Sequence, residues 1–230
     1  MTKTLTHAEK RARDRRIELL LRIATHIGAL LPLALLFWDW WNWRLVDPIR
    51  EATLRTGKPA IILLMLSLAI TPLDIIFGLK RLLPLRRTVG LYAFFYVCLH
   101  FILFVGVDYR LNPTLIRDGL LEKRFALAGL AAFILLIPLA ATSNQWAMRK
   151  LRKNWKRLHQ TVYAVGVLAV VHYFWLVKTG AYAQPILFTA ILAVLLLVRV
   201  KPIRQRIVRY RQSLTRRRSA AKMARSVSAE

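Results

Sequence analysis

Long apolar runs alternate with short basic segments along most of this chain. Six runs approach or reach the roughly 20 apolar residues that a helix needs to cross the hydrocarbon core of a bilayer. They occupy residues 20–38, 59–77, 88–107, 125–141, 158–177 and 184–200. The pattern predicts an all-α integral membrane protein built as a bundle of six transmembrane helices. No internal repeat is evident in the sequence.

The charges lie between these runs. The chain has 37 Lys and Arg against 11 Asp and Glu, a formal charge of +26, although 57% of its residues are hydrophobic. A nucleic-acid-binding domain could be this basic, but its positive charges would not be confined to loops and tails around uncharged spans. Of the Lys and Arg residues, 28 fall on one side of the predicted bundle and nine on the other. The positive-inside rule therefore places both termini in the cytoplasm.

Three segments follow from this pattern. Residues 1–19 form a basic cytoplasmic segment, residues 20–200 form the transmembrane domain, and residues 201–230 form a basic cytoplasmic tail that begins as a surface helix and frays into disorder. Because the first apolar run leads directly to further spans, we expect a retained helix and not a cleaved signal peptide.

Histidines within the spans are the strongest chemical signal. An ionisable residue at membrane depth is costly and therefore suggests function. His100 lies 12 residues after Thr88, roughly 18 Å along a helix, and His172 lies 13 residues after His159, roughly 20 Å. If both helices run outward, the two imidazoles stand at similar depth in the outer half of the membrane. Since histidine is the usual axial ligand of haem iron, the pair predicts a haem held between two helices.

Cysteine content restricts how a haem could be attached. Cys98 is the single cysteine, so the chain has no CxxCH attachment site and any haem would be b-type. His159 lies at the cytoplasmic end of its span and His26 lies early in the first, and either could serve a second cofactor. The alternative for all of them is hydrogen bonding between helices.

Two other membrane functions fit less well. Neither His100 nor His172 has an acidic or histidine neighbour at i,i+4, as a metal-transport site would favour. A proton-coupled transporter would bury more carboxylates. The chain also lacks a GxGxxG or Walker A motif, so no nicotinamide site is visible.

The motifs together resemble the MsrQ (YedZ) family over roughly residues 20–200. The resemblance rests on ArgArgThrValGlyLeu…CysLeuHis (86–100), AlaThrSerAsnGlnTrpAlaMetArgLysLeu (141–151), LeuHisGlnThrValTyr (158–163) and ValHisTyrPheTrpLeuValLys (171–178), with ThrHisIleGlyAlaLeuLeuPro (25–32) and AlaIleThrProLeu (69–73). That family is the haem-binding membrane subunit of the MsrPQ methionine-sulfoxide reductase system, within the group of ferric-reductase-like transmembrane domains.

The resemblance implies a bacterial inner-membrane electron carrier with b-type haem and FMN. Such a protein takes electrons from the quinone pool or a cytosolic flavin reductase and passes them to MsrP, a periplasmic molybdopterin enzyme that reduces methionine sulfoxide. By motif, His100 and His172 match the haem iron ligands and His159 matches a third histidine tied to haem binding. The carrier itself would have no catalytic residue, because reduction of the oxidised protein occurs on MsrP.

One position departs from the wider group, whose members place two histidines on the third helix. Here the position fourteen residues before His100 is Arg86, followed by Arg87. A second bis-histidine haem therefore lacks a ligand, and the cytoplasmic-side site could instead hold a flavin or a quinone. The open alternatives for function are a ferric or other haem-dependent transmembrane reductase and, in a different class, a haem-free transporter.

Overall fold

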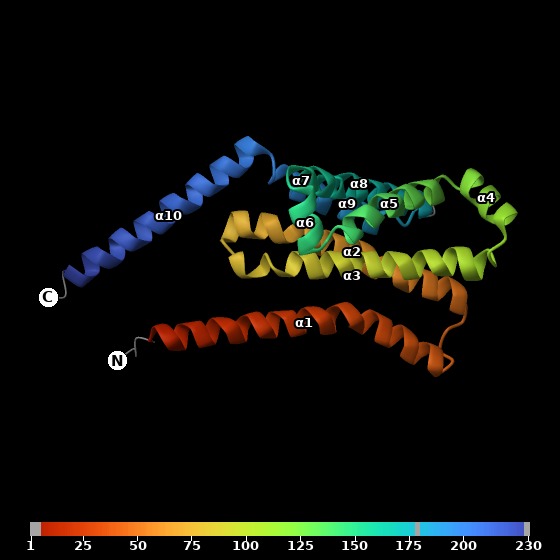
Figure 1. The fold of residues 1–230 in the computed structure, drawn as a ribbon, viewed down its shortest axis with the longest axis horizontal. Coiled ribbons are helices and arrows are strands. Elements are labelled where there is room, and N and C mark those ends of the chain that lie inside the picture. The colour runs from red at the N-terminus through yellow and green to blue at the C-terminus, as the bar shows by residue number, and fades with distance from the viewer. Residues whose placement is uncertain (1–5, 178–179, 228–230) are drawn as a thin grey trace.

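The computed structural model describes residues 6–177 and 180–227, and its regular structure there is helical (Figure 1). The main helices are α1 (His7–Trp41), α2 (Pro48–Phe77), α3 (Leu85–Ile102), α5 (Arg124–Ala141), α8 (Val162–Leu176), α9 (Ala183–Leu197) and α10 (Lys201–Val227). The shorter elements are η1 (Lys80–Leu82), η2 (Leu103–Asp108), α4 (Pro113–Glu122), α6 (Gln145–Leu151) and α7 (Lys153–Gln160). The prediction of an all-helical fold is confirmed.

Fewer helices qualify as membrane spans than the six apolar runs suggested. By length and composition four do so, namely α1, α2, α3 continued by η2, and α5, and a fifth if the bent pair of α9 and α10 counts as one. The fifth and sixth predicted runs correspond to α8 and α9, which have only 15 residues each. The fifth run is shortened because a turn at Thr161 separates α7 from α8. The structure therefore supports a multi-pass membrane protein with four to five candidate spans.

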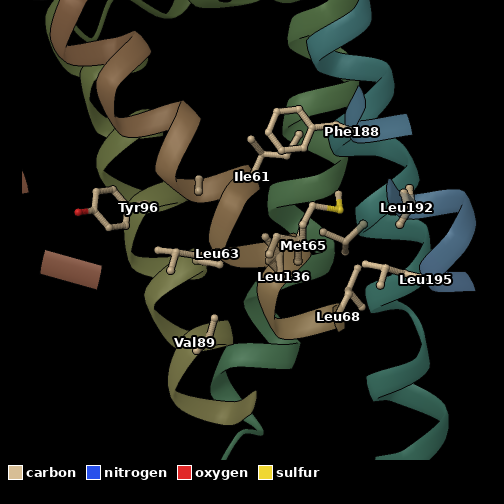
Figure 2. Packing of buried hydrophobic residues seen from close by; sticks show 14 of the residues in the cluster. Ile61, Leu63, Met65, Leu68, Val89, Tyr96, Leu136, Phe188, Leu192 and Leu195 are labelled. Atoms are coloured by element: carbon tan, nitrogen blue, oxygen red, sulfur yellow. The ribbon is translucent and has the colours of Figure 1, made fainter. Parts of the chain in front are cut away.

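Helix α2 is the centre of the bundle and α1 is its periphery. Half of the apolar window of α2 is buried inside the protein, against 11% of that of α1. Met65 and Leu68 of α2 lie on the side of Leu136 of α5 and the α9 residues Phe188, Leu192 and Leu195, whereas Leu63 lies on the side of α3 (Figure 2). Helix α2 packs mainly against α3, and α5 packs mainly against α8. The core thus consists of two helix pairs in contact.

The proline in the second half of α2 has a partner outside its own helix. Pro72 has no N–H, so the carbonyl of Leu68, four residues earlier, loses its helical hydrogen bond. The guanidinium of Arg199 donates to that carbonyl and also to the hydroxyl of Tyr163 at 2.8 Å. A residue after α9 therefore satisfies a backbone group that α2 leaves open, as membrane helices require.

A tyrosine performs a similar role in α1. The hydroxyl of Tyr96, which is fully buried, donates to the carbonyl of Ala29 at 2.7 Å and accepts from the N–H of Leu33 at 3.2 Å. Ala29 and Leu33 are four residues apart in α1 and lie on either side of Pro32. The Tyr96 hydroxyl therefore bonds a backbone group at each end of this helical turn. In Figure 2 the Tyr96 oxygen points away from the α2 residues. The two hydrogen bonds of Tyr96 link α1 to α3.

Helix α10 leaves the bundle at the end where the chain begins. Figure 1 shows both ends of the described chain at one end of the molecule and α4 at the other. Helices α9 and α10 are bent by 75°. Arg211 of α10 donates to the carbonyls of Asp74 and Ile75 in the last turn of α2, which is followed by Gly78 with φ 73°. Carbonyls at a helix C-terminus favour such a cation.

Candidate functional site

His100 of α3 lies against α2. Its Nδ1 is 2.9 Å from the carbonyl oxygen of Thr53. A Cβ built on Gly57, one turn further along α2, would lie 3.0 Å from Nδ1 and Cε1 of the ring. Because a carbonyl can only accept, Nδ1 carries the proton and Nε2 keeps its lone pair. The neighbouring helix thus fixes both the position of the ring and its tautomer.

His172 of α8 lies against α5 in the same way. Its Nδ1 is 2.6 Å from the carbonyl oxygen of Phe125, and a Cβ on Gly129 would lie 2.7 Å from that Nδ1. The hydrogen bond again leaves Nε2 as the basic nitrogen. Hydrogen bonding through one imidazole nitrogen to orient the other is the usual arrangement around a metal-ligating histidine.

The two arrangements are structural repeats of each other. Carbonyl, glycine and histidine occur at Thr53, Gly57 and His100 and again, 72 residues later in each case, at Phe125, Gly129 and His172. We call these six residues the paired-histidine site. The helix pairs α2–α3 and α5–α8 therefore form equivalent halves, a repeat that the sequence did not reveal because the residues around the three shared positions differ.

The spacing of the two imidazoles suits a metal between them. Their ring centres are 6.2 Å apart with an angle of 89° between the planes. A metal–nitrogen bond of about 2.0–2.1 Å puts a ring centre about 3.2 Å from the metal, so two opposed axial imidazoles have centres about 6.4 Å apart. The distance between the ring centres therefore fits a haem iron held between His100 and His172. Within the described residues no group of three or more His, Cys, Asp or Glu could hold a metal ion.

The chain next to His100 has an unusual backbone. Helix α3 passes directly into the π-helix η2, and Arg110 and Leu111 beyond it have positive φ angles of 50° and 55°. Single π-turns within helices are frequent at functional sites. The wider turn changes the direction of the side chains that follow the histidine, among them Phe104, whose ring lies 4.7 Å from that of Tyr109.

His159 lies at a separate place. Its ring stacks on Trp155 at 4.0 Å, and its Nε2 is 3.1 Å from the Thr142 hydroxyl. That hydroxyl donates to the carbonyl of Pro138 at 2.6 Å, so it accepts from His159, whose Nε2 therefore bears the proton. His159 thus has the tautomer opposite to that of His100 and His172. The structure brings the latter two together and keeps His159 apart.

A cavity of about 270 Å³ adjoins His159. Its wall includes Trp155, Arg86 and Arg87, with Ser67 and Gly90 where α2 and α3 cross closely. Under the 72-residue offset of the repeat, the α3 equivalent of His159 is Arg87 and not Arg86. Arg87 therefore stands at the position where a histidine would be needed to form a second histidine pair with His159.

Sequence reasoning found the histidines but missed the residues that hold them. Gly57, Gly129 and the carbonyls of Thr53 and Phe125 have no distinctive signal of their own, because a glycine or a carbonyl in an apolar run is common. The signal that could have found them is the repeated spacing of 43 residues between each glycine and its histidine.

Comparison with known proteins places the chain in a family. The family model described as ferric reductase like transmembrane component matches residues 56–170, which include four residues of the paired-histidine site, namely Gly57, His100, Phe125 and Gly129. A protein of Xanthomonas axonopodis pv. citri, named protein-methionine-sulfoxide reductase heme-binding subunit MsrQ, is 44% identical over 178 residues, covering 74% of this chain and 81% of its own. The chain belongs to the MsrQ family.

Other members give the same result. The MsrQ proteins of Bordetella pertussis and Xanthomonas campestris pv. campestris are 44% and 42% identical to this chain and share 84% and 83% of their lengths with it. No solved structure matches the chain. The names of these MsrQ proteins describe them as heme-binding subunits, which is the chemistry that the spacing of His100 and His172 accommodates.

Proposed function

We propose that this protein is the membrane electron-transfer subunit of a protein-methionine-sulfoxide reductase system. It would carry electrons from the quinone pool or a cytosolic flavin reductase across the bacterial inner membrane to the periplasmic molybdopterin enzyme MsrP, which repairs oxidised proteins. The observation that supports this most is the pair of imidazoles 6.2 Å apart, each with Nδ1 engaged by a backbone carbonyl. The names of the MsrQ relatives supply the system in which such a site works.

The paired-histidine site would hold b-type haem through Nε2 of His100 and Nε2 of His172. A haem bound there would supply reversible one-electron chemistry. The protein residues fix the ligands: the Thr53 and Phe125 carbonyls hold each tautomer, and Gly57 and Gly129 let the rings approach the neighbouring helices. Phe125, whose ring centre lies 5.9 Å from that of His172, would provide an apolar wall beside that imidazole.

We propose six membrane crossings with both termini in the cytoplasm. Helices α8 and α9 are uncharged in the described part of the chain, and each would cross with the help of its flanking turns. Two features favour an even number of crossings: both ends of the described chain lie at one end of the molecule (Figure 1), and the basic segments gather there.

The His159 cavity would be the cytoplasmic-side cofactor site. His159 offers Nδ1 in the tautomer that the Thr142 contact imposes, and Arg86 and Arg87 offer positive charge to a phosphate or carboxylate. Family resemblance suggests FMN, with the quinone pool or a flavin reductase as donor. At about 270 Å³ the cavity lies just below the usual range for cofactor pockets, so it would enclose part of such a group.

Optical spectra of the purified protein test the haem ligands. We expect a low-spin b-type spectrum for the wild-type protein that is lost or becomes high-spin in both His100→Ala and His172→Ala. His26→Ala is the matched control, because His26 bonds Tyr92 outside this site. A colourless wild-type protein from haem-replete cells, or full retention of the spectrum in both variants, would contradict the assignment.

A ferric reductase is the second candidate, favoured by the description of the matching family model. The two functions differ in the acceptor. Copurification with a periplasmic molybdopterin enzyme, and oxidation of the reduced protein by that enzyme with methionine sulfoxide present, would support the first. Oxidation by an external ferric chelate alone, without such a partner, would support the second.

A further inference from the structure

A large groove separates α1 from α3 on the side of the molecule where the chain begins. Its volume is about 740 Å³. One wall consists of Arg22, His26 and Leu30, spaced four residues apart on a single face of α1. The other wall comes from α3 and the turn before it, with residues Pro84, Leu85, Arg87, Thr88, Leu91, Tyr92 and Phe95. We call this feature the α1–α3 groove.

The polarity of the groove changes along its length in the same sense on both walls. Because α1 and α3 run in the same direction, Arg22 lies near Arg87 at one end, and Leu30 lies near Phe95 at the other. Eight residues separate the members of each wall, a rise of about 12 Å. The groove therefore accommodates a molecule with a polar head and an apolar chain, not a compact polar ligand.

The charge at the polar end is positive. Arg22 has one partner in the described chain, Glu18 at 2.6 Å, and Arg87 has no ion pair or hydrogen bond there. In the proposed topology this end lies at the cytoplasmic membrane surface, where anionic lipid headgroups are found. Basic pockets between transmembrane helices at this surface favour such headgroups.

The groove also lies beside a helix, α1, that is weakly packed against the rest of the protein. Only Ala29 and Leu36 of α1 are buried apolar residues, and its described polar contacts with α3 are the hydrogen bonds of His26 and Tyr96. An occupant of the groove would therefore fill the space between α1 and α3, on the side of the Tyr96 contact where Arg22 and Arg87 lie. Since Arg87 and Leu91 also line the His159 cavity, the occupant would lie on the other side of a shared wall.

We propose that the α1–α3 groove binds an anionic phospholipid as a structural ligand. Its phosphate lies at Arg22 and Arg87, and an acyl chain runs along Leu91 toward Leu30 and Phe95. The lipid holds α1 against α3, the helix that carries His100. The binding depends on charge at one end of the groove and on open space at the other, and it does not require the electron-transfer function proposed above.

Native mass spectrometry of the full-length protein tests this proposal. The probe is phosphatidylglycerol, offered against phosphatidylcholine of the same chains. We expect preferential retention of phosphatidylglycerol by the wild-type protein and about a fivefold loss of that preference in Arg87→Gln, since one cation near an anionic surface contributes about that factor. Leu91→Trp should abolish retention by filling the groove while leaving both arginines in place.

Arg15→Gln is the matched control, because Arg15 is an exposed arginine of α1 outside the groove. It should retain phosphatidylglycerol as the wild-type protein does, and far-ultraviolet circular dichroism should show that every variant is folded. Equal retention of both lipids, or an equal loss in Arg15→Gln, would overturn the proposal. So would a quinone extracted from the wild-type protein, lost in Leu91→Trp and insensitive to the lipid supplied.

Discussion

At the paired-histidine site each imidazole lies where only a glycine leaves it room. Replacing Gly57 or Gly129 by Ala puts a methyl group 3.0 Å or 2.7 Å from the ring, so the histidine must move or rotate. Such overpacking costs about 1–3 kcal/mol. We expect both variants to lose haem or to show changed ligand-field bands and a shifted midpoint potential, as measured by optical and paramagnetic resonance titrations.

Gly28→Ala is the control for this prediction, because a Cβ at Gly28 meets nothing within 4 Å. It should leave the spectrum unchanged and stabilise α1 slightly through better helix propensity. Unchanged spectra in Gly57→Ala and Gly129→Ala would mean that the rings are not held against α2 and α5 when the protein is loaded.

The histidines themselves could be predicted from the sequence, since an imidazole inside a 20-residue apolar run stands out by its cost. His100 and His172 were paired from helical rise alone, and the structure brings them together. The tautomers could not be predicted, because they depend on the carbonyls of Thr53 and Phe125, which belong to helices 47 residues away in the chain. The hydrogen bond between His159 and Thr142 could not be predicted from the sequence either.

At the scale of the helix, the contact between Arg199 and α2 should contribute measurably to stability. Arg199→Met removes a charged donor from the Leu68 carbonyl that Pro72 leaves open, so we expect a loss of about 1.5–3 kcal/mol in the free energy of unfolding. In a Pro72→Ala background the loss should be smaller, because residue 72 then supplies an N–H to Leu68. Unfolding in mixed micelles of the four proteins measures this coupling, and strict additivity would contradict it.

The hydroxyl of Tyr96 should matter for a similar reason. Tyr96→Phe removes the hydrogen bonds of the phenol to the Ala29 carbonyl and the Leu33 N–H beside Pro32, which we expect to cost about 1–3 kcal/mol. Tyr92→Phe is the matched control, since the bond of Tyr92 goes to the exposed His26. Protease access to α1 in detergent reports the difference, and equal access in the two variants would argue against a special role for Tyr96.

Apolar runs predicted the helices well but not how they end. The run at 158–177 begins inside α7 and is interrupted at Thr161, and the last three residues of the run at 184–200 form the break at which the chain bends by 75° into α10. Hydropathy gives the extent of an apolar run but does not mark backbone turns inside it, such as those at Thr161 and at residues 198–200. The sequence predicts a basic tail that begins as a surface helix and frays into disorder, but α10 continues as a helix to Val227.

At the scale of the whole molecule, the number of crossings can be tested by labelling. In a Cys98→Ala background, single cysteines replace Trp43 and Ala181, which are exposed, and Ser213 in α10. Six crossings predict that a membrane-impermeant maleimide labels the first two in whole cells whose outer membrane is permeabilised, and the third only after lysis. Labelling of position 181 only after lysis would reduce the count of crossings.

The 72-residue repeat has a consequence for how the molecule could be assembled. Thr53, Gly57 and His100 lie before α4, and Phe125, Gly129 and His172 lie after it. A chain interrupted within α4 would therefore leave each fragment with one complete ligand, its carbonyl and its glycine. Two such fragments expressed together would have the means to rebuild the site at their interface, as a heterodimer in which each part supplies one histidine.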